Sequence, residues 1–321
     1  MPGLLAVYRK ELADHFSSAR FTLLLTMILM ISLIMAFMTG SGLRTELEGF
    51  AKPSLVFLML FTSTGAVFSL AQFVAFFGPL IGLVLGFDAI NRERTARTLS
   101  KLLAQPIYRD AVLNGKFLAA LTTVAVLLTS IVLLISGLGL WVLGVVPGAE
   151  EVGRLAVYLV ISVVYVGFWL ALAILFSVVL RNMATSALAV LAVWIFLAFL
   201  VPLGATAVAD GVAPVPAGGA PVSVNAVLRH ERIRRTVSYV SPMALYTDAT
   251  DVILDPMRKT TRSLVLMGPI ERLSISRFES PLPLAESVLV VAPLLVLLIA
   301  ATFVCFGLGY TCFMRQEIRT T

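Results

Sequence analysis

The amino-acid sequence predicts an all-α integral membrane protein with six transmembrane helices. Of its 321 residues, 59% are apolar and 13% are charged, and its mean hydropathy is +0.99. Soluble domains do not have this composition. Long apolar runs recur along the chain, separated by polar segments that are mostly short. Each run is long enough to form a helix that crosses the hydrocarbon layer of a bilayer.

The net charge of +6 does not indicate nucleic-acid binding in a chain of this kind. Its basic residues stand next to the apolar runs, where phospholipid headgroups would meet them. We therefore expect the lipid bilayer to be a partner of this chain and nucleic acid not to be one.

The N-terminal segment, residues 2–20, predicts a helix that lies on the membrane surface. Leu5, Tyr8, Leu12 and Phe16 recur at the spacing of one helical face. The first span follows at residues 21–39, because this apolar run is too long, and lacks the small-residue cleavage site, for a signal peptide.

The second span is predicted at residues 67–87, after an interfacial or re-entrant helix at 54–66. Gly78, Gly82 and Gly86 recur at intervals of four in this span, so they form a glycine face that lets another helix approach closely. Pro79 permits a bend beside the first of them.

The remaining spans are predicted at residues 117–145, 155–180, 184–203 and 286–313, with a tight turn at Arg181 and Asn182. Residues 204–285 are hydrophilic and include a basic helix at 225–240 and a second helix at 242–254. The expected domains are therefore residues 1–203 with five spans, an external region at 204–285, and residues 286–321 with the sixth span and the C-terminus.

Charge asymmetry sets the expected orientation. Residues 1–20, 88–116, 181–183 and 314–321 hold about 12 Lys and Arg residues, whereas the short loops of the other side hold only Arg44, Lys52 and Arg154. Both termini and residues 88–116 are therefore expected in the cytoplasm of a multi-pass protein of the cell membrane.

Several kinds of chemistry are missing from the sequence. No phosphate-binding Gly-x-x-x-x-Gly-Lys-Ser/Thr motif occurs, no charged residue is expected at mid-membrane depth, and His15 and His230 lie on opposite sides. The chain is therefore predicted not to be an enzyme and to bind no cofactor or metal itself. Met27, Met30 and Met38 could bind Cu(I), but lipid-facing methionines explain the pattern more simply.

Residues 86–116 form a polar, basic segment between two spans. Leu99, Leu102 and Leu103 have the spacing of a short amphipathic helix that Pro106 ends, and Asp88 and Arg92 are spaced for an ion pair. From spacing alone, this segment could be a surface helix that merely tethers two spans.

The residue pattern also resembles a known family. Asp88, Glu93-Arg94, Thr98-Leu99, Leu102-Leu103, Pro106, Arg109 and Gly115-Lys116 are similar to the cytoplasmic loop of ABC-2-type permeases, the membrane subunits of ATP-binding-cassette exporters. The N-terminal Tyr8-Arg9-Lys10-Glu11-Leu12 and the C-terminal residues 315–319 resemble the family's ends. The six-span permeases of nitrous-oxide-reductase maturation systems are the most similar group by this pattern. Arg97 stands where the family often has glycine.

The resemblance implies a type V exporter-like fold in which residues 88–116 hold a coupling helix for a separate ATPase subunit. Two ATPase copies, which bind ATP and Mg, would work with this chain and a second permease copy or paralogue. The residues that the resemblance assigns to the ATPase contact are Asp88, Arg92, Glu93, Arg94, Thr98, Leu99, Leu102, Leu103, Pro106, Arg109 and Lys116, with a secondary contact at Tyr8, Lys10, Glu11, Arg181 and Asn182.

The functional expectation is therefore a permease subunit of an ABC exporter. A second interpretation is a mechanotransmission subunit that drives an external partner protein without moving a substrate. A third is an uncoupled channel or scaffold. The basic residues Arg229, Arg232, Arg234 and Arg235 could contact anionic headgroups or substrate, or could simply be solvated.

Overall fold

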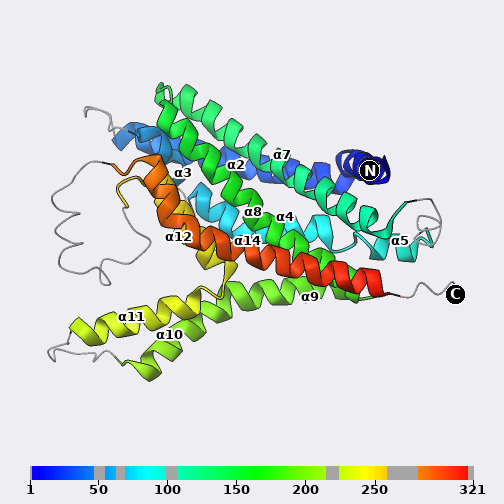
Figure 1. Cartoon of the computed structure of the whole chain (residues 1–321). Helices are drawn as coiled ribbons and strands as arrows, with labels where there is room; N and C mark the ends of the chain where they lie inside the picture. Colours follow the sequence, from blue (N-terminus) through cyan, green and yellow to red (C-terminus); the bar gives the residue numbers. More distant parts are fainter. Residues whose placement is uncertain are drawn as a thin grey trace.

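The protein is a bundle of long helices that run roughly parallel to one axis (Figure 1). The computed structural model describes residues 2–46, 55–62, 69–98, 107–214, 224–258 and 281–316. Among these, six helical segments are long and apolar enough to cross a membrane. The prediction of an all-α fold with six spans is confirmed.

The helices follow one another without strands in the part of the chain that the structure describes. Their bounds are α1 Pro2–Ser17, α2 Ala19–Glu46, η1 Val56–Leu58, α3 Met59–Thr62, α4 Leu70–Gly86, α5 Asn91–Thr95, α7 Arg109–Leu143, α8 Ala149–Val179, α9 Met183–Ile195, η2 Phe196–Leu200, α10 Val201–Val212, α11 Val224–Ser238, α12 Pro242–Leu254 and α14 Leu284–Arg315.

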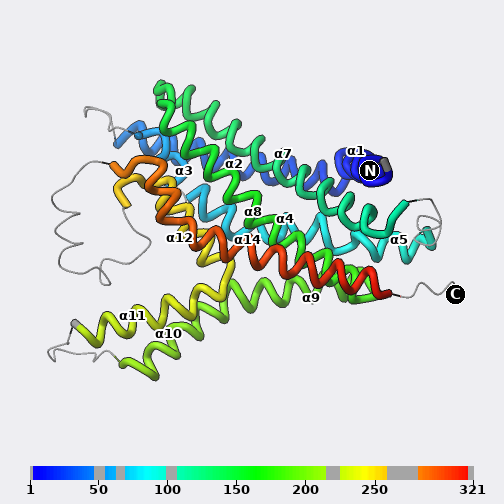
Figure 2. The backbone as a smooth tube through the Cα atoms, in the orientation of Figure 1, coloured from blue at the N-terminus to red at the C-terminus, as the bar shows by residue number. Residues whose placement is uncertain are grey.

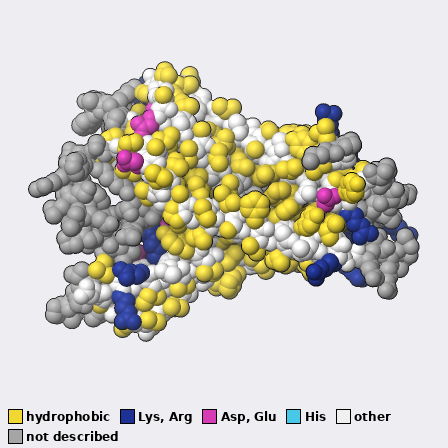
Figure 3. All heavy atoms as spheres, in the orientation of Figure 1, with side chains coloured by type: hydrophobic (Ala, Val, Ile, Leu, Met, Phe, Trp, Pro, Cys, Tyr) yellow, Lys and Arg dark blue, Asp and Glu magenta, His cyan; other side chains and the backbone are white. Residues whose placement is uncertain are grey.

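Helix α1, helix α5 and the end of α14 lie at one end of the bundle, which we name the terminal end (Figure 2). The opposite end, with α11 and the start of α14, is the distal end. Hydrophobic side chains cover the middle of the face seen in Figure 3, and the charged side chains visible on that face lie toward the two ends. This distribution is what a membrane-spanning bundle requires.

The helices extend beyond the spans predicted from hydropathy. The third span begins at Arg109 and the fourth at Ala149, and the fifth continues through η2 and α10 to Val212 rather than ending near Leu203. Hydropathy detects only the part of a helix that lies in hydrocarbon. The polar turns at both ends are helical as well but carry no apolar signal.

Helix α8 is the centre of the bundle. In its most apolar window 67% of the residues are buried, against 11% for the helix formed by α9, η2 and α10. It packs most extensively against α14 and α4 and also contacts α7, α12 and α9. The other spans are therefore arranged around one helix that few lipids could reach.

The glycine face of α4 packs directly on α8. A Cβ atom at Gly82 would lie 2.8 Å from the backbone nitrogen of Leu170, and one at Gly86 would lie 2.7 Å from the Cβ of Ala173. Neither position has room for a side chain, so the two backbones touch here.

Pro79 leaves the carbonyl of Ala75 without its usual helical donor, because proline has no N–H. The hydroxyl of Tyr165 on α8 donates a hydrogen bond to this carbonyl at 2.6 Å. Tyr165 and Ala75 are both buried in the bundle core, where water cannot replace the tyrosine hydroxyl as the donor to this carbonyl.

Helix α12, predicted within a hydrophilic region, packs inside the bundle at its distal half. Leu245, Tyr246 and Ile253 are buried against α4, α8 and α14. The Tyr246 ring stacks on Tyr165 with centroids 4.3 Å apart, and its hydroxyl lies 2.8 Å from the Oγ of Ser162. The i, i+3, i+4 spacing of its apolar residues is the signal of this burial.

Arg154, expected in a short loop, lies in the second turn of α8 and is fully buried. Its guanidinium donates to the carbonyl of Ile253 at 2.8 Å, to the carbonyl of Leu282, and to Ser287 at 3.3 Å. Glu150 accepts from it at 2.9 Å. One arginine therefore joins the start of α8 to the end of α12 and the start of α14.

We predict that Tyr165→Phe destabilises the protein by about 1–3 kcal/mol, because the buried carbonyl of Ala75 loses its donor. Pro79→Ala restores a backbone donor, so in that background the same change should be less damaging by about 1 kcal/mol. Thermal unfolding of the four variants of this cycle in detergent measures the coupling.

Tyr8→Phe is the matched control, because the Tyr8 hydroxyl donates only to the hydroxyl of Thr122, at 3.2 Å. Tyr8→Phe should lower the midpoint temperature of thermal unfolding less than Tyr165→Phe does. If Tyr165→Phe destabilised the protein equally with and without Pro79, the Tyr165 hydroxyl would not be the replacement for the donor that the proline lacks.

Candidate functional site

The candidate site is the terminal end, where α5 bonds to α7, to α8 and to the end of α14. After α4, residues 87–90 turn the chain, and α5 follows as a short helix. The backbone N–H groups of Ile90 and Asn91 donate to the Oγ of Ser177 on α8, at 3.0 and 3.2 Å. This hydroxyl satisfies donors that a helix start leaves free, so it fixes α5 to the end of α8.

Arg94 attaches α5 to the last turn of α8 and to the end of α14. Its guanidinium donates to the carbonyls of Val178 at 3.0 Å and Leu180 at 3.3 Å. It also donates to the side chain of Gln316, whose amide in turn donates to the Val178 carbonyl at 2.8 Å. The C-terminal carbonyls of α8 are thus capped by an arginine, a favourable position for a positive charge.

Three charged residues join α1, α5 and α7, and we name them the charge triad: Glu11, Glu93 and Lys116. The Lys116 Nζ lies 2.8 Å from an oxygen of Glu11 and 2.7 Å from one of Glu93. The lysine is 5% exposed, so both pairs are largely shielded from water. One ammonium group therefore links three helices.

Burial raises the pKa of the Glu11 carboxyl, but the charge and hydrogen bond of Lys116 and the contact with Lys10 outweigh it, so the net pKa is lowered. Glu11 therefore stabilises the fold in the ionised form. This contribution is present above the ordinary pKa of 4.5 and is lost as the pH falls through the lower, folded-state value.

Helix α1 reaches α7 by close packing as well as by charge. A Cβ atom at Gly115 would lie 2.8 Å from the side chain of Val7, so α1 lies directly on α7 at this glycine. The predicted helix is present, with Leu5 and Phe16 of its apolar face exposed.

A cleft of about 370 Å³ opens between α1 and α5 beside the charge triad. Its lining includes Asp14, His15 and Arg92, besides the triad itself. One oxygen of Glu93, Oε2, is buried there without a hydrogen-bond partner. The predicted ion pair between Asp88 and Arg92 is wrong, because Asp88 pairs with Arg20 of α2 at 2.9 Å.

Arg97 adopts a backbone conformation that favours glycine, with a φ of 54°. The N–H of Thr98 donates to the carbonyl of Glu93, and that of Arg97 to the carbonyl of Arg94. This bonding pattern ends a helix with a left-handed residue, which is glycine in most proteins. The conformation explains why glycine suits this position and why arginine is strained here.

The predicted contact residues separate into two groups. Glu93, Arg94, Lys116 and Glu11 bond to other helices of this chain, whereas Arg92, Thr98 and Arg181 are exposed. Arg109 is exposed too, but its guanidinium donates to the backbone carbonyl of Gln316 at 3.4 Å. Asn182 caps α9 by accepting from the N–H of Ala184 at 2.9 Å. Leu99, Leu102, Leu103 and Pro106 lie outside the described residues.

Sequence reasoning did not identify Ser177 or Gln316 as site residues. Ser177 stands alone in an apolar span, and a lone serine usually bonds to its own helix. Gln316 is 222 residues from Arg94. For neither residue does the neighbouring sequence indicate the distant residue to which it bonds.

The whole chain matches one family model, that of the ABC-2 family transporter proteins, over residues 5–318. The chain belongs to this ABC-2 transporter family. The six spans and the short α5 between the second and third of them are consistent with that membership.

A curated relative of this ABC-2 protein is the probable ABC transporter permease protein NosY of Pseudomonas aeruginosa. The two are 37% identical over 119 residues, which is 37% of this chain and 38% of the relative. The aligned part thus spans well under half of either chain. Together with the family match it identifies a transmembrane subunit of an ABC transporter.

We predict that Arg97→Gly stabilises the end of α5 by about 1 kcal/mol, because glycine adopts a positive φ without strain. The N–H of Thr98 should then exchange with solvent deuterium about fivefold more slowly, as measured by mass spectrometry.

Arg97→Ala is the control, because it removes the same charge but keeps a side chain in the strained conformation. Its exchange rate at Thr98 should stay near that of the unmodified chain. Equal protection in the glycine and alanine variants would assign the effect to charge instead.

Proposed function

We propose that this chain is the permease subunit of an ABC exporter and that a separate ATPase subunit docks on residues 88–116. Ten described Lys and Arg residues lie in segments of the terminal end, so we place this end in the cytoplasm. They are Arg9, Lys10, Arg20, Arg92, Arg94, Arg97, Arg109, Lys116, Arg181 and Arg315. The distal end is then external, and the protein is a multi-pass subunit of the cell membrane.

The observation that supports this proposal best is the set of bonds that α5 makes. A merely solvated surface helix would not need a buried ion pair to α7 and an arginine bonded to α8 and α14. Because α5 is attached to three spans through its own side chains, a displacement of α5 would move the ends of all three.

We assign different tasks to the two groups of contact residues. Exposed Arg92, Thr98 and Arg109, with the apolar face predicted for Leu99, Leu102 and Leu103, would meet the ATPase. The internally bonded residues Glu93, Arg94 and Lys116 would transmit the resulting motion. In this division the ATP and Mg belong to the ATPase, and this chain carries out no chemical step.

The path into the membrane follows from the packing. Motion of α5 would reach α7 through Lys116 and α8 through Arg94 and Ser177. Helix α4, which leads into α5, touches α8 at Gly82 and Gly86. Two copies of this chain, or this chain and a paralogue, with two ATPases would alternate between inward- and outward-facing arrangements.

A mechanotransmission subunit is the second candidate, and the position of α12 favours it. Helix α12 leaves the distal region and packs on α8 and α14, so movement of those spans would reach the external segments. An external partner protein bound there could be driven without transport of a substrate.

The test uses the complex purified from native membranes with its ATPase. Leu102→Asp should abolish co-purification of the ATPase, because a charge in an apolar docking face is not solvated. Glu93→Leu should leave co-purification intact but reduce the effect of the permease on ATP hydrolysis about tenfold, because the charged link between α5 and α7 is lost.

Glu11→Gln is the matched control, since it weakens the link of Lys116 to α1 but keeps the link to α5. It should retain most of the coupling. An intact ATPase complex in Leu102→Asp would refute the docking surface, and full coupling in Glu93→Leu would refute the route through Lys116.

A further inference from the structure

Helices α10 and α11 form a hairpin that projects from the distal end, away from α14 (Figure 1). They pack along a narrow stripe of α10, in which Ala205 and Ala209 are fully buried. The rest of the α10 surface is exposed and largely apolar, with Leu203 65% and Val212 54% exposed. An isolated hairpin with this surface is not suited to water alone.

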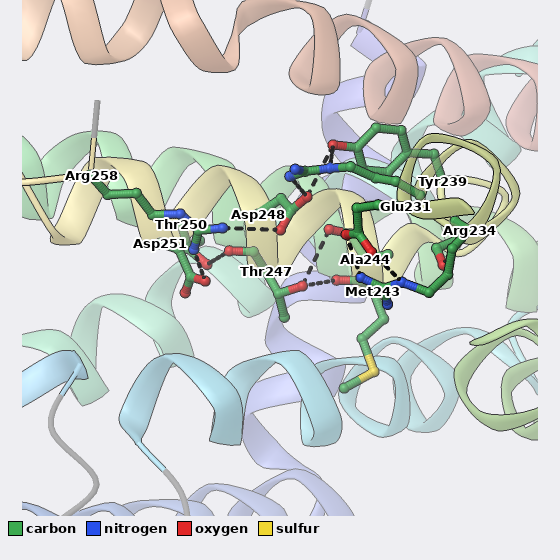
Figure 4. A network of polar contacts seen from close by, with 12 residues as sticks. Glu231, Arg234, Tyr239, Met243, Ala244, Thr247, Asp248, Thr250, Asp251 and Arg258 are labelled. Atoms are coloured by element: carbon green, nitrogen blue, oxygen red, sulfur yellow. Dashed lines mark hydrogen bonds and ion pairs between the residues drawn. The ribbon is translucent and has the colours of Figure 1, made fainter. Parts of the chain in front are cut away.

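Two of the four basic residues of α11 that the sequence singled out are used inside the fold. Arg234 pairs with Glu231 at 2.6 Å, and Arg235 pairs with Asp248 of α12 at 2.5 Å. Figure 4 shows this network, in which Asp248 also accepts from the hydroxyl of Tyr239 at 3.0 Å. Arg235 therefore attaches the hairpin to α12, whereas Arg234 pairs within α11.

The other two arginines, Arg229 and Arg232, are exposed. The guanidinium group of neither arginine has a hydrogen bond or an ion pair with any described residue. They are three positions apart and therefore lie on the same face of α11, next to each other. This face of the hairpin carries two adjacent, uncompensated positive charges.

The contact between His230 and Asp210 indicates how far Arg229 and Arg232 lie from the start of α9, measured along the membrane normal. The His230 Nε2 lies 2.9 Å from the Oδ1 of Asp210, so Arg229 is level with the last turn of α10. Asp210 follows the start of α9, at Met183, by roughly 27 residues, a helical length of about 40 Å. A hydrocarbon core is about 30 Å thick, and the headgroup layers extend it to about 40–45 Å.

We propose that Arg229 and Arg232 bind the phosphate groups of anionic phospholipids in the outer leaflet. The orientation is the one proposed above, and the chemistry is that of guanidinium groups, which bind phosphate oxygens with two parallel hydrogen bonds. The apolar surface of α10 that precedes Asp210, which includes Leu203, lies closer to the bilayer centre and would contact the acyl chains below those headgroups.

The lipid is favoured over an external acidic protein because apolar and basic surfaces occur side by side on one hairpin. A protein partner would have to cover Leu203 and Val212 as well as the two arginines. A phospholipid matches both surfaces, because its charge and its hydrocarbon are joined at this depth.

The test titrates the purified full-length chain in neutral detergent with dioctanoyl phosphatidylglycerol and follows its thermal unfolding. Dioctanoyl phosphatidylcholine and inorganic phosphate are the comparison ligands. We expect stabilisation by phosphatidylglycerol, little by phosphatidylcholine or phosphate, and a loss of the effect at high salt. The double variant Arg229→Gln with Arg232→Gln should need about 30-fold more phosphatidylglycerol, about fivefold for each arginine.

Arg44→Gln is the matched control, because it removes an exposed charge at the end of α2 and should leave the titration unchanged. Arg229→Lys with Arg232→Lys should retain most of the effect. Unchanged phosphatidylglycerol binding in the double glutamine variant would overturn the proposal. So would equal stabilisation by inorganic phosphate, or arginine-dependent binding of an external protein with no lipid effect. None of these readouts involves the ATPase, so the result is independent of ATPase docking.

Discussion

The structure depends on how the two ends of one buried helix are bonded to the helices around them. Helix α8 lies at the centre of the bundle, and its end groups cannot rely on free access to water. At the terminal end, Arg94 donates to the carbonyls of Val178 and Leu180. At the distal end, Arg154 joins the first turns of α8 to α12 and α14. Each arginine supplies several donors in a fixed plane, which a lysine could not do.

Close backbone contact in the middle of the bundle complements these polar ends. Gly82 and Gly86 let α4 touch α8, and Tyr165 supplies the donor that Pro79 lacks. The carbonyl of Ala75, which the proline leaves without a helical donor, is thereby satisfied by the neighbouring helix. Because the replacement bond connects two helices, the geometry of α4 and that of α8 depend on each other.

The helical architecture could be predicted from the sequence because hydropathy and length are local properties. The glycine spacing likewise indicated a face for close packing. The start of α12 at Pro242 and its end at Leu254 were signalled by Ser241-Pro242 and Asp255-Pro256. Its burial was missed because the polar surroundings of the segment were weighed above its apolar spacing.

The site was harder to predict, since its bonds join residues far apart in the chain. Glu93 and Lys116 were singled out as residues of an ATPase contact, but the pairing of Lys116 with Glu11 bridges 105 positions. Arg154 was counted as a loop residue because hydropathy placed the start of its helix at residue 155, nearly two turns after its start at Ala149. The spacing of Glu150 and Arg154 was the available signal, because residues at i and i+4 are neighbours only within a helix.

The place of Gln316 matters for anyone who builds fusion proteins or truncations of this chain. Its side chain accepts from Arg94 and donates to the carbonyl of Val178, so the last described residue is part of the framework that holds α5. An affinity tag joined directly to this residue, or a stop codon before it, would disturb a region far away in sequence. A purification handle is therefore better separated from Gln316 by a flexible spacer.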